Sequence, residues 1–514
     1  MGKVNLDALI QREDFEVEEN DIAGKKKETI SIEDIKPDSF FFMNVRKPDF
    51  QRETNEWDEA KISEFILSFV EGDLIPAIIL WRSSAGYLFV IDGSHRLSAL
   101  SAWVNDDYGD GEITKRFYDG IIPDDQLSIA SKTRSIVNKN IGSYSDFKLA
   151  LSHPDKVKPE ILTKSKNLAA LAIQLQWVEG DSKKAESSFF KINQQASPID
   201  KTELKLLKTR RNPNSIAARA IIRSGKGHKY WSQFNLQIQE EIQALSEDVN
   251  AILFKPKLEN PIKTLDIPIG GKSYSSKTLP LILDFVNIAN GYTNKTKLTD
   301  DISGEATINC LKRTLKVARL INSNHPSSLG LHPAIYFYSK KGTHKVAMFY
   351  GITQFVIELK QKKRLNRFIE MRERLEQLIW DYDYLVQQIN RKYRSAQGSY
   401  QYISKFFWDC IIEMEHIESN DKVIDKLIAT NYDYLTKEAR QSDTSEQTSF
   451  STNKKSAVFI SEALQSATKC KICNGLIHRN SISIDHIKRK QDGGKASLDN
   501  GQVTHPYCNT GYKN

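Results

Sequence analysis

Two pairs of metal-binding residues near the end of the 514-residue chain constrain its folding more than any other feature. Cys470 and Cys473 are separated by two residues, and His505 and Cys508 repeat that spacing about 30 residues later. A turn with this spacing presents two ligands to one tetrahedral ion, so two such turns predict a structural zinc site. The other two cysteines are isolated, and a disulfide framework is not expected. We therefore predict a small zinc-stabilised C-terminal domain.

Several polar residues lie between and just after these pairs, although zinc binding does not need them. Asp485 and His486 follow a short alternating stretch, Asn500 lies after a Gly-Gly turn, and Asn509 directly follows the last cysteine. Phosphodiester hydrolysis needs an activated water and a cation that neutralises phosphate charge. An imidazole and hard oxygen ligands supply these two requirements. A zinc ribbon used only for binding is the alternative, but it gives the two asparagines no role.

This pattern resembles the HNH, or ββα-metal, endonucleases with asparagine in the final position. The resemblance covers about 45 residues. It implies that His486 is the general base, that Asp485 and Asn509 bind a catalytic Mg²⁺ or Mn²⁺ ion, and that Asn500 holds the loop that orients the base. Residues 453–514 also contain ten Lys or Arg against four Asp or Glu. We therefore expect DNA as the partner of this domain.

The N-terminal third contains the pattern of a compact α+β unit. We expect strands at 40–42, 75–81 and 87–91, and helices at 58–72 and 97–104. The turn that joins the last strand to the last helix places polar side chains beside the exposed amides of a helix N-terminus, which favours phosphate. The candidate nucleotide or phosphate pocket comprises eight residues: Asp92, Gly93, Ser94, His95, Arg96, Gln51, Arg52 and Asn193.

The order of these N-terminal motifs is similar to that in the ParB/sulfiredoxin-like domain of GmrSD-type modification-dependent restriction enzymes and of phosphorothioate-sensing SspE nucleases. The resemblance spans roughly residues 30–205. In that family the turn reads Asp-Gly-Gln-Gln-Arg and carries nucleoside triphosphate hydrolysis. This chain has Ser94 and His95 in place of the two glutamines. The resemblance therefore implies a nucleotide site, with an additional NTPase activity left open.

Apolar residues between 368 and 389 recur in alternating steps of three and four over about three heptads. A helix packed into the bundle of its own domain is the interpretation that we favour. A coiled coil is the alternative, and it makes the helical domain the place where an oligomer would form.

The chain is predicted to be a multidomain α+β protein with a ParB-like N-terminal domain, a mainly helical middle and a zinc-stabilised ββα-metal C-terminal domain. The predicted parts are a leader at 1–29, the sensor or nucleotide domain at 30–205, a helical domain at 206–440, a Ser/Thr-rich linker at 441–457 and the nuclease domain at 458–514. No stretch approaches the ~18 apolar residues of a membrane span, and the N-terminus is acidic where a signal peptide is apolar. We expect a cytoplasmic protein.

Together these features predict a restriction or antiviral defence endonuclease, in which the N-terminal domain senses DNA modification or nucleotide and a tethered HNH domain cuts, with phage DNA as one target. Two alternatives remain open. One is a nucleic-acid-binding regulator with an inactive HNH remnant, against which the intact Asp485, His486 and Asn509 argue. The other is a toxin that hydrolyses free NTP.

Overall fold

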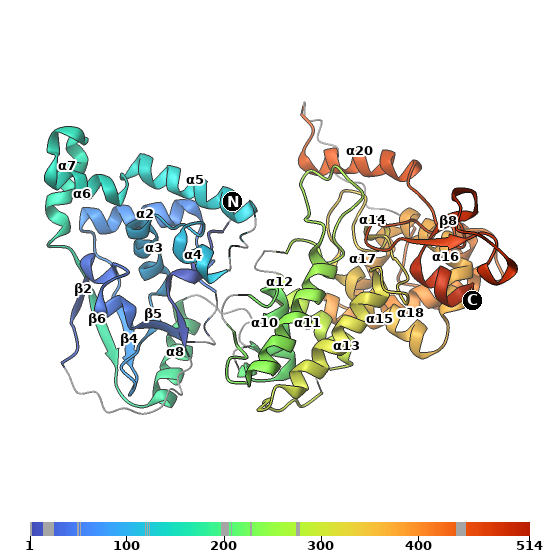
Figure 1. The fold of residues 1–514 in the computed structure, drawn as a ribbon, viewed down its shortest axis with the longest axis horizontal. Helices are drawn as coiled ribbons and strands as arrows, with labels where there is room; N and C mark the ends of the chain where they lie inside the picture. Colours follow the sequence, from blue (N-terminus) through green and yellow to red (C-terminus); the bar gives the residue numbers. More distant parts are fainter. Residues whose placement is uncertain are drawn as a thin grey trace. The chain divides into compact units, whose positions relative to one another are not determined.

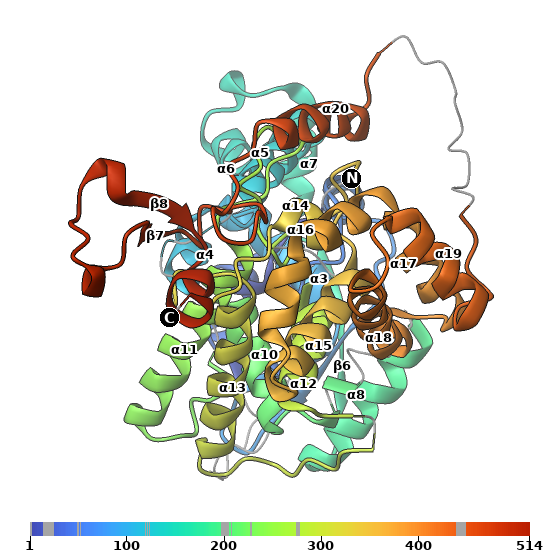
Figure 2. The same ribbon diagram turned by 90° about the vertical axis from the view of Figure 1, so that its right-hand side faces the viewer.

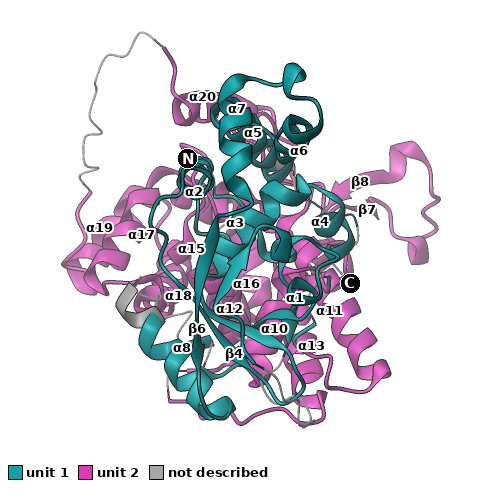
Figure 3. Ribbon diagram, turned by 90° about the vertical axis from the view of Figure 1, so that its left-hand side faces the viewer, with its two compact units in different colours: residues 1–210, 226–230 teal, residues 211–225, 231–514 magenta. Residues whose placement is uncertain are grey.

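The chain folds into two compact units, shown in two colours in Figure 3. The first contains residues 1–210 and 226–230, and the second contains residues 211–225 and 231–514. The computed structural model describes residues 3–13, 25–48, 51, 53–118, 120, 122, 124–196, 205–206, 208–226, 229–273, 278–293, 295–437 and 449–513.

The first unit is an α+β fold built on one mixed sheet (Figure 1). Its helices are α1 (Phe40–Met43), α2 (Glu59–Glu71), α3 (Ser94–Asn105), α4 (Glu112–Phe117), α5 (Asp124–Asn140), α6 (Tyr144–Ser152), α7 (Pro159–Leu168) and α8 (Ser182–Ala196). Its strands are β1 (Arg12–Glu13), β2 (Thr29–Ser31), β3 (Val45–Pro48), β4 (Ile78–Arg82), β5 (Leu88–Asp92) and β6 (Ala172–Val178). The strand order is β1-β3-β5-β4-β6-β2, in which β5 pairs with β3 in parallel and with β4 in antiparallel orientation.

Strand β5 is buried on both faces, because helices pack against both sides of the sheet. Val90 belongs to the larger core, which includes residues of α2 and α3. Phe89 and Ile91 point to the other face and join a second core with Phe189 of α8. Alternate side chains of a strand point to opposite faces, so this continuous apolar run suits a central strand. The predicted strands at 75–81 and 87–91 are thus confirmed, with ends shifted by one to three residues.

Two N-terminal segments differ from the sequence-based prediction. Residues 40–42, which we expected to form a strand, begin the short helix α1, because the Ser39 side chain accepts a hydrogen bond from the backbone N–H of Phe42. Phe40 is left 89% exposed. Residues 3–13, which we assigned to a leader, contribute strand β1 and buried apolar side chains to the core.

The second unit is mainly helical and carries a small hairpin near its end (Figure 2). Its helices are α10 (Pro213–Ile222), α11 (Leu236–Phe254), α12 (Thr278–Asn290), α13 (Glu305–Ile321), α14 (Pro333–Tyr336), α15 (Val346–Gln361), α16 (Leu365–Asp381), α17 (Asp383–Lys392), α18 (Ala396–Met414), α19 (Asn420–Thr430) and α20 (Thr452–Gln465). Strands β7 (Ser483–His486) and β8 (Gly501–Thr504) and a π-helical turn, η6 (Cys508–Tyr512), complete the unit. This organisation confirms the predicted fold class.

The heptad pattern at 368–389 belongs to two consecutive helices, α16 and α17, which meet at Tyr382. Its apolar residues Phe368, Leu375 and Leu385 are fully buried inside the unit. These apolar residues therefore pack inside their own domain, which is the interpretation that we favour, and they do not form a coiled coil with a second chain.

Part of the predicted linker is helical. Helix α20 begins at Thr452, and Ser456 is buried within it. The backbone N–H of Ile262 donates to the Ser456 hydroxyl across 3.0 Å, which fixes this helix to the preceding helical part. Residues 438–448 lie outside the described part of the chain. Among the described residues, none of the helices combines the length and the apolar character that crossing a membrane requires.

Candidate functional site

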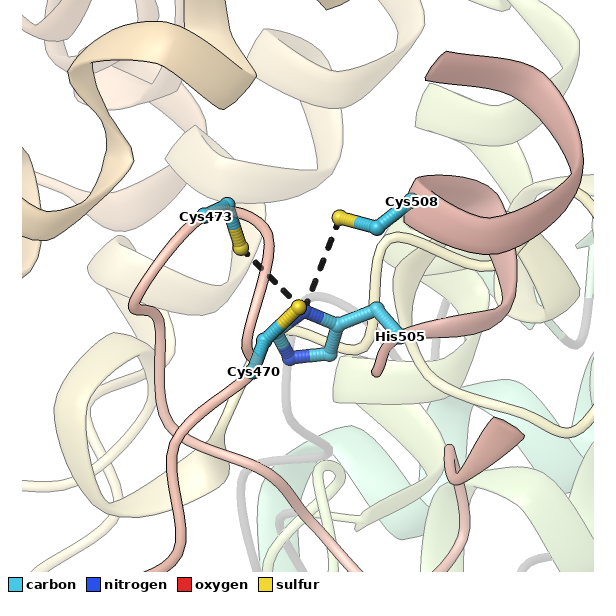
Figure 4. A group of neighbouring side chains, drawn as sticks. All are labelled: Cys470, Cys473, His505 and Cys508. Atoms are coloured by element: carbon cyan, nitrogen blue, oxygen red, sulfur yellow. Dashed lines mark hydrogen bonds between the residues drawn. The ribbon is translucent and has the colours of Figure 1, made fainter. Parts of the chain in front are cut away.

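The four predicted zinc ligands lie together in the second unit (Figure 4). Their ligand atoms are all within 4.8 Å of one another, and all four residues are buried. The Cys473 sulfur lies 3.4 Å, and the Cys508 sulfur 3.8 Å, from Nδ1 of His505. The first pair sits on a tight turn, in which the N–H of Ile472 donates to the sulfur of Cys470. A tetrahedral zinc ion with bonds of about 2.0 to 2.3 Å fits this donor set.

The surroundings of His505 favour the form of this ligand that binds metal. Nε2 of His505 lies 3.0 Å from the carbonyl oxygen of Leu476, to which it donates, so Nδ1 keeps its lone pair facing the sulfurs. Burial lowers the pKa of His505, and the neighbouring Arg372 lowers it further, so the ring is neutral. Hydrogen bonds among the three thiols lower the pKa of Cys470 and raise the pKa of Cys473 and of Cys508. A neutral imidazole and thiolates are the species that zinc binds.

The β7–β8 hairpin presents the predicted catalytic carboxylate and imidazole. Asp485 is buried, and its Oδ2 accepts hydrogen bonds from Nε2 of Gln502 at 2.8 Å and from Nζ of Lys513 at 2.5 Å. Gln502 is the residue opposite Asp485 in the antiparallel register. Next along the strand, His486 is half-buried, and its Nε2 is buried without a hydrogen-bond partner among the described residues.

The two asparagines fasten the segments around this hairpin. Nδ2 of Asn509 donates to the Ser483 hydroxyl at 2.8 Å, which ties the π-helical turn to β7. The Asn500 side chain accepts from the N–H of Lys488 at 2.7 Å and donates to the carbonyl oxygens of Lys488 at 3.1 Å and Lys495 at 2.8 Å. Asn500 therefore closes the loop that follows His486.

In the first unit, the predicted turn connects β5 to α3. Gly93 has φ +101°, and a Cβ atom there would lie 3.0 Å from Ile78 and 3.1 Å from the Arg96 guanidinium, so this position requires glycine. Nη2 of Arg96 donates to Oδ2 of Asp92 at 2.6 Å and to the carbonyl oxygen of Ala77 at 3.1 Å. The arginine thus holds the turn against the start of β4.

Other residues of the predicted N-terminal pocket are placed in part. Nε2 of the buried Gln51 donates to the Ser94 hydroxyl at 3.3 Å. The His95 ring stacks on Trp57 with the ring centroids 5.6 Å apart. Arg52 lies outside the described residues. Asn193 lies in α8, but its side chain is outside the described part of the chain. The structure therefore brings Gln51 to the turn and shows His95 as a packed aromatic ring.

Comparison with known protein families assigns both ends of the chain. Residues 32–210 match the model of the GmrSD restriction endonuclease N-terminal domain, and residues 470–514 match the model of the HNH endonuclease. The chain carries a GmrSD-type N-terminal domain and a C-terminal HNH domain. No curated protein and no solved structure matched the chain. The two domains support a restriction-type DNA endonuclease, and the HNH domain implies use of a divalent metal.

Sequence reasoning missed three residues that contact the HNH site. Lys513 reaches Asp485, and its place four residues after Asn509, one helical turn on, was a signal that could have found it. Arg372 and Glu376 of helix α16 contact the zinc-binding segment: Nη1 of Arg372 lies 3.2 Å from Nδ1 of His505, and Glu376 accepts a hydrogen bond from the N–H of Leu476. More than 90 residues separate them from that segment, and no motif marks them.

Proposed function

We propose that this protein is a metal-dependent DNA endonuclease of a restriction or antiviral defence system, and that its GmrSD-type domain regulates cleavage by sensing DNA modification or nucleotide. One observation carries the proposal. The buried Cys/His cluster and the hairpin that bears Asp485 and His486 occur within a single HNH match.

His486 is the proposed general base. Its position at the end of β7 and its unpartnered, buried Nε2 mark a ring whose hydrogen bonding is incomplete without another group. A buried nitrogen of this kind costs about 1 to 3 kcal/mol, so a ligand or water that completes the bonding is favoured. The imidazole would accept a proton from the attacking water and increase its nucleophilicity.

Asp485 and Asn509 are the proposed ligands of the catalytic metal. They offer a carboxylate and an amide oxygen, which suit Mg²⁺ or Mn²⁺. When bound, such an ion stabilises the negative charge that develops on the phosphate. Asn500 positions the loop after His486 through its three hydrogen bonds. The roles are consistent with the HNH match, since all these residues lie inside it.

The loop that Asn500 closes is the proposed DNA-contacting segment. Lys488, Lys490 and Lys495 are exposed on it, and Arg489 donates to the carbonyl oxygen of Lys513. Exposed cations beside a phosphodiesterase site are suited to the DNA backbone, where each contact contributes mainly electrostatic and salt-dependent affinity.

The turn from Asp92 to Arg96 is the proposed nucleotide or phosphate site of the GmrSD-type domain. Support comes from its place at the N-terminus of the twelve-residue helix α3 and from the guanidinium of Arg96, which already pairs with an anionic oxygen. Any NTPase activity of the protein is proposed to occur at this same site. Phosphate binding here would compete with Asp92 for Arg96 and so alter the turn.

The proposal is tested with purified full-length protein and with modified and unmodified phage DNA. Each DNA is incubated with and without Mg²⁺ or Mn²⁺ and with and without each NTP, and the products are separated on a gel. We expect metal-dependent cleavage that responds to modification or nucleotide. Binding without cleavage in all conditions would favour a DNA-binding regulator, and NTP turnover without DNA cleavage would favour an NTP-hydrolysing toxin.

A further inference from the structure

Helix α16 of the helical region carries an arginine whose side chain reaches the zinc cluster. The Arg372 side chain is fully buried, and its Nη1 lies 3.2 Å from Nδ1 of His505. Nη1 and Nη2 donate to the carbonyl oxygens of Leu329 at 2.5 Å and Gly330 at 2.9 Å. The guanidinium therefore joins the cluster to the segment that precedes α14.

A carboxylate on the same helix completes the contact. Oε1 of Glu376 accepts from Nε of Arg372 at 2.7 Å, and its Oε2 accepts from the N–H of Leu476 at 2.9 Å. The approach is close, because a Cβ atom at Gly475 would collide with Nε of Arg372. Two adjacent residues of the zinc-binding turn are thus fitted to this one ion pair.

The net charge of the zinc-bound cluster favours a positively charged group, such as a guanidinium, beside it. Three thiolates and a neutral imidazole around Zn²⁺ carry a net charge of about −1. A buried charge is unfavourable unless an opposite charge or hydrogen bonds compensate it. Because Nη1 of Arg372 lies 3.2 Å from Nδ1 of His505, the guanidinium places its positive charge directly against a ligand of the cluster.

We propose that the Arg372–Glu376 ion pair, whose guanidinium end faces the cluster, stabilises the negative charge of the zinc centre, so that helix α16 forms part of that centre and the HNH domain holds zinc with full affinity only while it is packed on the helical region. The inference concerns zinc binding and does not depend on DNA cleavage.

Other contacts extend the same interface. The hydroxyls of Ser328 and Ser481 are hydrogen-bonded at 3.0 Å, and Nδ1 of His478 lies 3.2 Å from Oδ1 of Asn322. The N–H of Tyr507 donates to the carbonyl oxygen of Ser328 at 2.9 Å. The segments that carry the two ligand pairs therefore both contact the helical region.

The test compares zinc retention in full-length variants. Zinc content is measured by elemental analysis, and the rate of zinc release is followed with a chromogenic chelator. We expect Arg372→Met to release zinc at least tenfold faster than the wild type and Arg372→Lys to restore part of the retention. Arg374→Met is the matched control, because Arg374 lies on the same helix and donates to the carbonyl oxygens of Met414 and Ile417, away from the cluster.

A paired variant separates charge from folding. Arg372→Met combined with Glu376→Gln removes both buried charges and keeps an acceptor for the N–H of Leu476, which is less disruptive than removing one partner. This protein should show the circular dichroism of the wild type and still release zinc about tenfold faster. Its Co²⁺-substituted form should keep the thiolate-to-cobalt absorption bands, which show an unchanged ligand set.

Two results would overturn the inference. One is a folded paired variant that releases zinc at the wild-type rate. The other is equal acceleration by Arg374→Met, which would show that any loss of an arginine on α16 loosens the cluster. In both cases the ion pair would only hold the backbone segments together.

Discussion

The ammonium group of Lys513 lies 2.5 Å from Oδ2 of Asp485, the carboxylate that we propose as a ligand of the catalytic metal. Both side chains are largely buried, and the same ammonium donates to the carbonyl oxygen of His486 at 2.6 Å. A divalent cation that binds Asp485 must therefore share this oxygen with Lys513 or displace it.

Lys513→Met should lower the Mg²⁺ concentration that gives half-maximal DNA cleavage. Removing a positive charge next to the carboxylate removes both a competitor and a source of repulsion for the metal, and an effect of about 1 kcal/mol corresponds to roughly fivefold. The measurement is a Mg²⁺ titration of cleavage rate. Lys454→Met removes an exposed cation of helix α20, outside the hairpin and its loop, and should leave the Mg²⁺ dependence unchanged. An identical requirement in Lys513→Met and the wild type would show that Lys513 does not compete with the metal.

Asn500→Ala should slow DNA cleavage about 10- to 100-fold with zinc content unchanged. The change removes three hydrogen bonds that close the loop after His486, each worth about 1 kcal/mol. Asn500→Asp keeps the acceptor for the N–H of Lys488 but loses both donations, so its rate should fall between those of Asn500→Ala and the wild type. Single-turnover cleavage rates provide the measurement, and a wild-type rate in Asn500→Ala would refute the positioning role.

The second unit should lose stability on acidification, in part because of His478. Burial lowers the pKa of this fully buried imidazole to about 4, despite the carboxylate of Asp266 at 4.0 Å. The unfolded chain binds a proton near pH 6.5, so stability is complete above that pH and is lost as the pH falls toward 4. At pH 5 the loss from His478 alone is about 2 kcal/mol.

Urea denaturation at pH 7 and pH 5 measures this loss. His478→Asn keeps a donor for Asn322 and has no titrating group, so its free energy of unfolding should fall by about 2 kcal/mol less than that of the wild type. The pKa of the buried His332 is also lowered by burial, so the variant should retain part of the acid sensitivity. Equal losses in both proteins would contradict the assignment.

Arg96→Ala should remove the response of cleavage to nucleotide or DNA modification without abolishing cleavage itself. The guanidinium is mostly buried and pairs with Asp92, and a charge-assisted contact of this kind contributes about 1.5 to 3 kcal/mol. Lys115→Ala, which removes an exposed cation of the same unit, is the control. If Arg96→Ala still responds as the wild type does, the GmrSD-type domain would have to act as a DNA-binding platform instead.

Local patterns in the sequence identified the zinc cluster and one strand of the hairpin, because ligand spacing and strand alternation act over a few residues. That strand, β7, begins two residues later than the alternating stretch at 481–484 and includes Asp485 and His486. The turn at Asp92 could be placed for the same reason, since a strand, a glycine and a helix follow one another directly. The run of three phenylalanines at 40–42 misled the prediction, because apolar character alone does not distinguish a strand from a capped helical turn.

Long-range packing could not be read from the sequence. Nothing near Arg372 indicates that it reaches His505, more than 130 residues further along the chain. The Ser/Thr-rich composition of 441–457 indicated a tether, but the helix from Thr452 onward packs through Ser456. An account based on a freely tethered nuclease domain therefore misses the contacts that hold the HNH domain on the helical region.

The most direct test of the proposed nuclease is the single-turnover cleavage rate of His486→Ala, measured with Mg²⁺ on the DNA that the wild-type protein cuts best. Removal of a general base lowers a rate by about 10² to 10⁴. We predict a loss of this size, with zinc content and DNA binding unchanged, whereas Ile487→Ala, at the exposed neighbouring position, cuts normally. A folded, zinc-containing His486→Ala protein that cuts DNA at the wild-type rate would contradict the assignment of this hairpin as the catalytic site.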